Sequence, residues 1–155
     1  MRNMRCPYCG SSVRLRSADG IYTNNGSGTR LYVCDSYPGC DAYVRVHAGT
    51  DTPVGNLANA KLRALRGVAH QHFDRLHKSG LMTKAEAYTW LAYMLQSPLA
   101  QAHIGYLSEY YCELVISESK KLFDAWRWKL KDKTPSAPIT GGVCRATHQS
   151  TAKAC

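Results

Sequence analysis

The sequence predicts an α+β protein in which a small N-terminal β-hairpin module with four cysteines precedes a small α-helical domain and a mobile C-terminal tail. Two observations predict this order. Cysteines are paired near the N-terminus, and the hydrophobic pattern changes its period near residue 50. The expected boundaries are 1–50, 51–131 and 132–155. With 155 residues, 45% of them hydrophobic, the chain is long enough to bury a core.

The β module is indicated by alternating polar and apolar residues. The Gly- and Asn-rich stretch 24–29 predicts a hairpin tip between one strand around Tyr22 and another around Leu31. Further strand candidates lie at 13–15 and 43–46. We therefore expect a short antiparallel sheet at this end of the chain.

Three helices are expected in the region that begins near residue 55. The first has an apolar stripe at helical spacing, made of Leu62, Leu65, Ala69, Phe73 and Leu76. Gly80 is a natural end for this helix. Thr83 and Glu86 have the spacing of a capping box, which predicts the start of a second helix that ends before Pro98. Ser108 is placed to cap a third helix.

The tail is expected from Asp132 onward, because the periodicity gives way there to Pro, Gly, Ser, Thr and Ala. The stretch 88–107 contains no Asp, Glu, Lys or Arg and is long enough to span a membrane. That stretch also contains Pro, Gly, Gln and His residues, which hydrocarbon penalises. We therefore expect it to form protein core, with no membrane association.

The strongest chemical signal is a set of four cysteines, Cys6, Cys9, Cys34 and Cys40. Two residues separate the first pair, so both thiolates can bind one ion from a tight turn, and Gly10 lets the backbone turn sharply after it. A hairpin would bring the second pair alongside, as in a zinc ribbon. Four thiolates complete a tetrahedral shell, so we expect one structural Zn²⁺ with no position left for a reacting water.

Three alternatives to zinc are open: buried free cysteines, a disulfide pair, and an iron–sulfur cluster, which four thiolates also suit. The spacing and the need of so small a module for a crosslink favour zinc. The chain has seven cysteines, and no charged-then-apolar secretory leader precedes the first of them. A reducing compartment, the cytoplasm, is therefore expected.

The cysteine motifs also resemble those of known families. Cys-Pro-Tyr-Cys-Gly at 6–10 and Tyr-Pro-Gly-Cys-Asp at 37–41 resemble the C-terminal zinc ribbons of type IA DNA topoisomerases. Together with Val-His-Ala-Gly-Thr at 46–50 and Ala-His-Ile-Gly at 102–105, they resemble still more a family of small phage and bacterial zinc-finger-containing proteins, over about residues 4–118. This second resemblance implies a phage- or mobile-element protein acting in the cytoplasm of a bacterial host. The first implies contact with single-stranded DNA, without strand passage, because the topoisomerase catalytic domains are missing.

A nucleic-acid partner is also favoured by the formal net charge of +9. Tyrosines interleaved with arginines suit a single strand of DNA or RNA, since bases stack on the rings and guanidinium groups meet phosphates. The candidate residues are Arg14, Arg16, Tyr22, Arg30, Tyr37 and Arg45 in the module, with Arg63 and Arg66 on the first helix. The alternative is that the tyrosines form a small core and the arginines are solvated. Because the charge is spread along the chain, we expect modest, salt-sensitive affinity.

A protein partner is the rival hypothesis. Aromatic residues in the helical region exceed what a small core needs, and Trp90, Tyr93, Trp126 and Trp128 are the candidates for a homodimer contact or for a surface that inhibits or redirects a host enzyme. The alternative is that they pack internally. Cys112 is expected in the core, and Cys144 and Cys155 have no assigned role. No nucleophile–base or paired-carboxylate pattern occurs, so a non-enzymatic accessory or regulatory role is expected.

Overall fold

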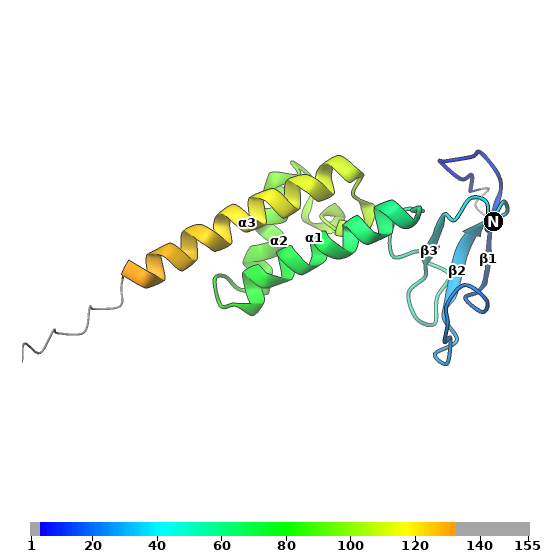
Figure 1. Cartoon of the computed structure of the whole chain (residues 1–155), viewed down its shortest axis with the longest axis horizontal. Helices are drawn as coiled ribbons and strands as arrows, with labels where there is room; N and C mark the ends of the chain where they lie inside the picture. The colour runs from blue at the N-terminus through cyan, green and yellow to red at the C-terminus, as the bar shows by residue number, and fades with distance from the viewer. Residues whose placement is uncertain (1–3, 133–155) are drawn as a thin grey trace, which may run out of the picture.

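The computed structural model describes residues 4–132 and has the predicted α+β order, with the sheet at one end of an elongated molecule and the helices at the other (Figure 1). The elements are β1 Val13–Ser17, β2 Arg30–Cys34, β3 Tyr43–Arg45, α1 Ala60–Lys78, α2 Lys84–Met94, the 3-10 turns η1 Leu99–Gln101 and η2 Ile104–Tyr106, and α3 Glu109–Asp132. The predicted tail beyond Asp132, with Cys144 and Cys155, lies outside the described residues. No helix in the described part of the chain is both long and apolar enough to cross a membrane.

The sheet is antiparallel in the order β1-β2-β3, with Leu15 opposite Tyr32 and Tyr32 opposite Val44. The prediction that the segment around Tyr22 pairs with β2 is wrong, because β1 takes that place. Tyr22 instead lies in the connecting loop, where its N–H donates to the carbonyl of Ala18 at 2.8 Å in a tight turn. The side chain of Asn25 holds the rest of this loop.

The backbone pairing of the β module continues past the expected boundary at residue 50. The N–H of Val54 donates to the carbonyl of Arg45 at 2.9 Å. Tyr43 and Ala58 then exchange two backbone hydrogen bonds of 3.1 and 3.2 Å. The segment that leaves β3 therefore returns along its free edge before α1 begins, which satisfies backbone groups of an otherwise open strand.

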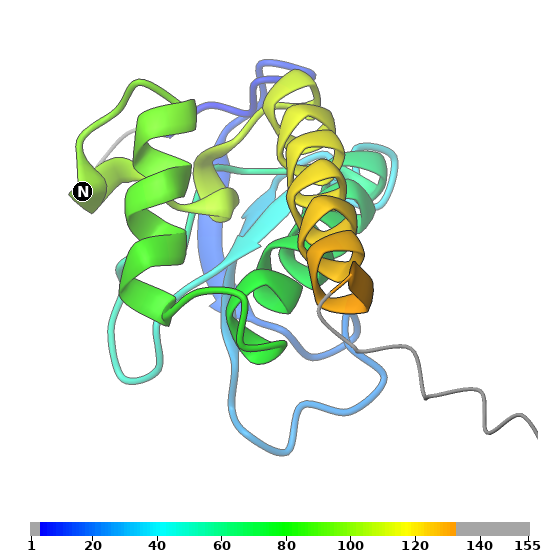
Figure 2. The same cartoon turned by 90° about the vertical axis from the view of Figure 1, so that its left-hand side faces the viewer.

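In the helical layer α1 and α3 lie side by side and α2 crosses them (Figures 1 and 2). The predicted stripe of α1 faces the shared core, in which Ala69, Phe73 and Leu76 are buried together with Leu91 of α2. Cys112 of α3 is buried in the same core, as expected. The core is built between the helices, and the sheet packs against the start of α1.

The predicted capping box at the start of α2 is present. The N–H of Glu86 donates to the hydroxyl of Thr83 at 3.2 Å, and the carboxylate of Glu86 accepts the N–H of Thr83 at 2.7 Å. These two bonds satisfy backbone donors that the first turn of a helix otherwise leaves free.

Replacing Thr83 with alanine is therefore expected to lower the free energy of unfolding by about 1 kcal/mol. Thermal or urea denaturation measures this change. The matched control is Thr89→Ala, because the Thr89 hydroxyl only donates to the Ala85 carbonyl of its own helix, at 3.0 Å. Equal effects of the two substitutions would contradict a capping role.

Two glycines bring the sheet and the helical layer into backbone contact. A Cβ added at Gly55 would lie 2.6 Å from the carbonyl carbon of Gly105, and one added at Gly105 would lie 2.6 Å from the carbonyl oxygen of Val54. The N–H of Asn56 donates to the carbonyl of Gly105 at 3.0 Å. Only residues without a side chain allow this approach.

Two arginines of α1 complete the junction between the sheet and the helices. The Arg63 guanidinium stacks 3.7 Å above the ring centre of Tyr43 and donates to the carbonyls of Asp41 and Ala58 at 2.7 and 2.6 Å. It also pairs with the Asp41 carboxylate, whose oxygen accepts the first N–H of α1, that of Ala60, at 2.8 Å. We therefore leave Arg63 out of any nucleic-acid surface.

Arg66 is used in the same way one turn later. Two of its nitrogens donate to the carbonyl of Leu107 at 3.1 and 2.8 Å, and a third donates to the carbonyl of Asn56 at 2.8 Å. The burial that these contacts bring lowers the pKa of its guanidinium from the ordinary value. Its hydrogen bonds hold the helical layer against the sheet, so it too is left out of the nucleic-acid surface.

Candidate metal centre and arginine–tyrosine face

The four predicted cysteines converge at one end of the sheet. Cys6 and Cys9 come from the turn before β1, Cys34 is the last residue of β2, and Cys40 precedes β3. All four Sγ atoms lie within 4.8 Å of one another. The Sγ atoms of Cys6 and Cys40 are 3.6 Å apart, and those of Cys9 and Cys34 are 3.3 Å apart.

This geometry fits zinc. A tetrahedral shell with Zn–S bonds of about 2.3 Å separates neighbouring sulfur atoms by about 3.8 Å, which lies within the observed spread. A disulfide needs sulfur atoms about 2.0 Å apart, and the four cysteines are free. The set therefore binds a single structural zinc through four thiolates, and the protein itself fills every ligand position.

The first ligand turn is shaped by its glycine. The N–H of Gly10 donates to the carbonyl of Cys6 at 2.9 Å, and Gly10 adopts a φ of +75°, which favours glycine. The N–H of Cys6 donates to the carbonyl of Ser11 at 2.8 Å and closes the turn. Gly10 therefore has the function that the sequence predicts for it.

Backbone N–H groups are aimed at the sulfur atoms. Those of Ser11, Ser36 and Ala42 each donate to the cysteine two residues earlier, which is Cys9, Cys34 and Cys40 respectively. Hydrogen bonds of this kind stabilise negative charge on thiolates and orient them toward the metal. The two ligand turns are also tied together, since the hydroxyls of Ser11 and Ser36 lie 2.7 Å apart.

Two of the thiols differ in acidity before the metal binds. Hydrogen bonds from the hydroxyl and the N–H of Ser11 lower the pKa of the exposed Cys9 to about 6. Burial raises the pKa of Cys34 to about 12. Zinc binding therefore displaces a proton from Cys34, while the lowered pKa of Cys9 favours its thiolate form.

The strand register gathers three of the predicted nucleic-acid arginines on one face of the sheet. Cross-strand partners point to the same side, so Arg14 shares a face with its partner Val33 and with Tyr43 beyond it. In the next row, Arg16 and Arg45 lie on either side of Leu31. We define the arginine–tyrosine face as Arg14, Arg16, Tyr22, Tyr37, Tyr43 and Arg45.

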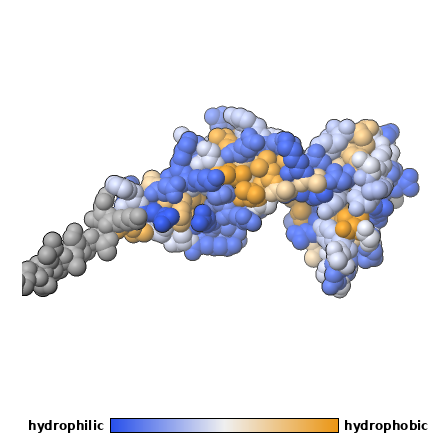
Figure 3. Space-filling model, in the orientation of Figure 1, coloured by the Kyte–Doolittle hydropathy of each residue, from blue (hydrophilic) through white to orange (hydrophobic). Residues whose placement is uncertain are grey.

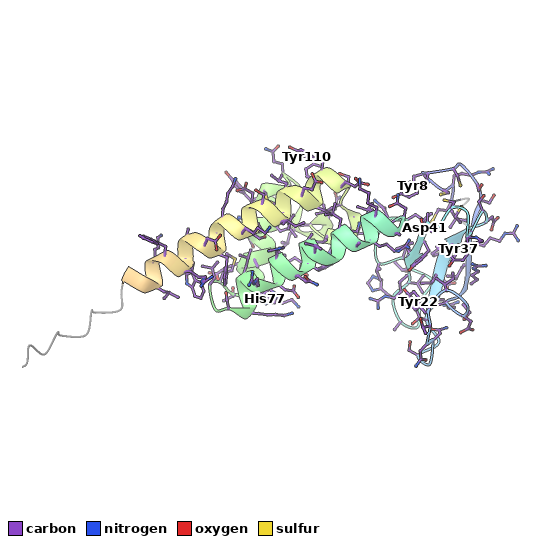
Figure 4. All side chains as sticks on the ribbon, in the orientation of Figure 1. Tyr8, Tyr22, Tyr37, Asp41, His77 and Tyr110 are labelled. Carbon is purple, nitrogen blue, oxygen red and sulfur yellow. The ribbon has the colours of Figure 1, made fainter. Side chains whose placement is uncertain are left out.

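The three tyrosines of this face cover a small apolar cluster formed by the buried Leu31 and Val33. Tyr22 and Tyr43 meet edge to face with ring centres 6.1 Å apart. All three remain half-buried rather than fully enclosed, and Figure 4 labels two of them, Tyr22 and Tyr37, on the sheet. Tyr22 and Tyr37 combine the two roles that the sequence left open, since each packs on the core and stays partly exposed, whereas the Arg63 guanidinium covers the Tyr43 ring.

Two residues differ from the prediction for this surface. Arg30 occupies the other face of β2, where it pairs with the Asp51 carboxylate at 2.5 Å and donates to the carbonyl of Thr50 at 3.1 Å. Tyr43, which the sequence favours as a member of the ribbon's small core rather than as a binding residue, lies on this face and packs against that core. Its position two residues before Arg45 on a strand is the pattern that could have revealed it.

The four candidate protein-interface residues do not form one cluster. Trp90 is half-buried against the helical core, and Trp126 is half-buried with its ring 5.6 Å from that of Phe123. Tyr93 is 85% exposed and Trp128 is 67% exposed. Among the described residues, no ring contact joins any two of these four.

Comparison with known protein families gives a match. The profile of a family of zinc-finger-containing domains matches residues 2–122, which include all four zinc ligands and the start of α3. No curated protein and no solved structure matches the chain. The match spans the ribbon and most of the helical layer, so the two are parts of one family unit. The chain belongs to this family of zinc-finger-containing domains.

Proposed function

We propose that this zinc-binding protein is a non-enzymatic accessory protein that associates with single-stranded nucleic acid through the arginine–tyrosine face. The strand register carries the proposal, because it places three arginines on the side of the sheet where Tyr22 and Tyr37 are half-buried rather than enclosed. A single strand offers unstacked bases to such rings and phosphates to the guanidinium groups. A closed shell of four thiolates supports a structural rather than a catalytic metal.

The charges on this face are available to a ligand. No ion pair in residues 4–132 uses Arg16 or Arg45, and both side chains are exposed. Arg14 is 78% exposed and pairs with Asp35 at 3.1 Å, a surface contact that a phosphate could replace. Arg16 lies over the Tyr37 ring, 5.4 Å from its centre, so a charged group and a stacking surface are adjacent.

The test is binding of fluorescently labelled single-stranded oligonucleotides by anisotropy at several salt concentrations. Replacing both Arg16 and Arg45 with alanine is expected to weaken binding about tenfold and to reduce the salt slope by about 1.4, since each phosphate contact on a single strand contributes about 0.7. Zinc content verifies that the ribbon is intact in each variant.

The matched control is Arg30→Ala, because Arg30 lies on the opposite face of the same sheet and is already paired with Asp51. It removes one charge without touching the proposed surface. If Arg30→Ala weakened oligonucleotide binding as much as Arg16→Ala or Arg45→Ala does alone, the loss would reflect only the change in net charge. Absence of binding by the wild-type protein at low salt would refute the proposal.

A protein partner is the second candidate function, and the exposure of Tyr93 and Trp128 favours it. Such a partner would be a host enzyme that the protein inhibits or redirects. Both proposals include an origin in a phage or mobile element and a location in the cytoplasm of a bacterial host. Failure of Tyr93→Ser and Trp128→Ser to reduce an interaction with a purified partner would remove these residues from it.

A further inference from the structure

A groove of about 600 Å³ lies between the end of α2 and the start of α3. Its walls include Leu95, Ser97, Gln101, Tyr106, Leu107 and Tyr111, and none of its lining residues is charged. Tyr106 and Tyr111 are 44% and 41% exposed. Figure 4 labels the neighbouring Tyr110 at the start of α3, and Figure 3 shows apolar surface set among hydrophilic side chains on the helical layer.

The groove also contains a hydroxyl without a partner. The Oγ atom of Ser97 is buried and makes no hydrogen bond within the described residues. This hydroxyl is enclosed by the protein, so the accessible polar group that the groove offers to a ligand carbonyl is the amide of the exposed Gln101.

These features suit a proline-rich segment in the polyproline II conformation. Its proline rings pack against aromatic side chains, and its backbone forms no internal hydrogen bonds, which leaves its carbonyls free to accept. A charged peptide would find no partner in this uncharged groove. The chemistry therefore favours a neutral ligand that has prolines at regular spacing.

The chain itself contains such a segment. Pro135-Ser136-Ala137-Pro138 has the P-x-x-P spacing and carries no charge. It follows α3 almost directly, with Lys133 and Thr134 between Asp132 and the first proline. The sequence thus supplies an occupant of the required chemistry.

The chain after Asp132 is too short for residues 135–138 to enter the groove of the same molecule. Tyr111 and Asp132 lie near opposite ends of α3, which at 1.5 Å per residue places them about 30 Å apart. The three steps from Asp132 to Pro135 span at most about 11 Å. We propose that residues 135–138 of one copy dock in the groove of a second copy, so that the protein self-associates by exchange of this segment.

The test measures self-association of the full chain by analytical ultracentrifugation across micromolar concentrations. The wild-type protein is expected to form a dimer. Replacing both Pro135 and Pro138 with alanine, or Tyr111 with serine, should raise the dimer dissociation constant at least about tenfold. The control is Tyr93→Ser, because Tyr93 is exposed on α2 but does not line this groove.

Mixing the two defective variants separates docking from misfolding. The Tyr111→Ser chain keeps an intact segment, and the Pro135→Ala/Pro138→Ala chain keeps an intact groove, so together they should form a mixed complex although neither associates with itself. A synthetic peptide of residues 133–140 should compete with the wild-type dimer. A chain that stays monomeric, a dimer indifferent to the proline substitutions, or a dimer lost with Tyr93→Ser would overturn the proposal.

Discussion

A chain in which Cys34 is replaced by serine is expected to lose its zinc and to unfold its ribbon. Cys34 is buried at the end of β2, and its Sγ lies 3.3 Å from that of Cys9. The ribbon's own core next to the metal is very small, and two of its buried members, Cys6 and Cys34, are zinc ligands. Structural zinc contributes on the order of 10 kcal/mol to modules of this kind, far more than so small a core supplies.

Elemental analysis should therefore show about one zinc per wild-type chain and close to none in the Cys34→Ser variant. Hydrogen exchange should show that amides of β1, β2 and β3 lose their protection, while those of the helical core keep theirs. The matched control is Cys112→Ala, which alters a buried cysteine of the helical core outside the four-cysteine set and should leave the zinc content unchanged. A variant that retained stoichiometric zinc would contradict the assignment of Cys34.

A second large effect is expected at Gly55. An alanine there would push its Cβ against the carbonyl group of Gly105, and both clashing atoms belong to backbone that cannot rotate away. The junction must open, with loss of the hydrogen bond from Asn56 to Gly105. We expect a loss of about 3 kcal/mol in the free energy of unfolding and a melting temperature lower by about 10 °C.

The control is Gly67→Ala. Gly67 lies in the exposed middle of α1, where an added Cβ meets nothing within 4 Å. Alanine is a better helix former than glycine, so this substitution should stabilise the protein by about 0.5–1 kcal/mol. Zinc content should be unchanged in both variants. Equal stability of the Gly55 variant and the wild type would show that the sheet and the helices do not depend on this contact.

Parts of the fold that depend on local spacing could be predicted from the sequence. The zinc ligands follow from the distance between cysteines, and the start of α2 follows from Thr83 and Glu86, three residues apart. The strand partner of β2 could not be predicted in this way. Its choice depends on a loop that is held by the side chain of Asn25, and no periodic pattern records such contacts.

The structural roles of Arg63 and Arg66 could not be predicted from the sequence either. On a helical wheel both lie on a basic flank, which is typical of a solvated face. The flank is covered because the sheet folds back onto it through a contact between Gly55 and Gly105, residues far apart in the chain. Charge patterns show which side of a helix is polar, but not which element later packs against it.

Asp41 occupies a position that couples the metal to the helices. It follows the ligand Cys40 directly, and its carboxylate accepts the first N–H of α1 and pairs with Arg63. Asp41 therefore connects the last zinc ligand directly to the start of α1. Withdrawal of zinc should therefore fray the first turn of α1, while the helical core farther along keeps its protection.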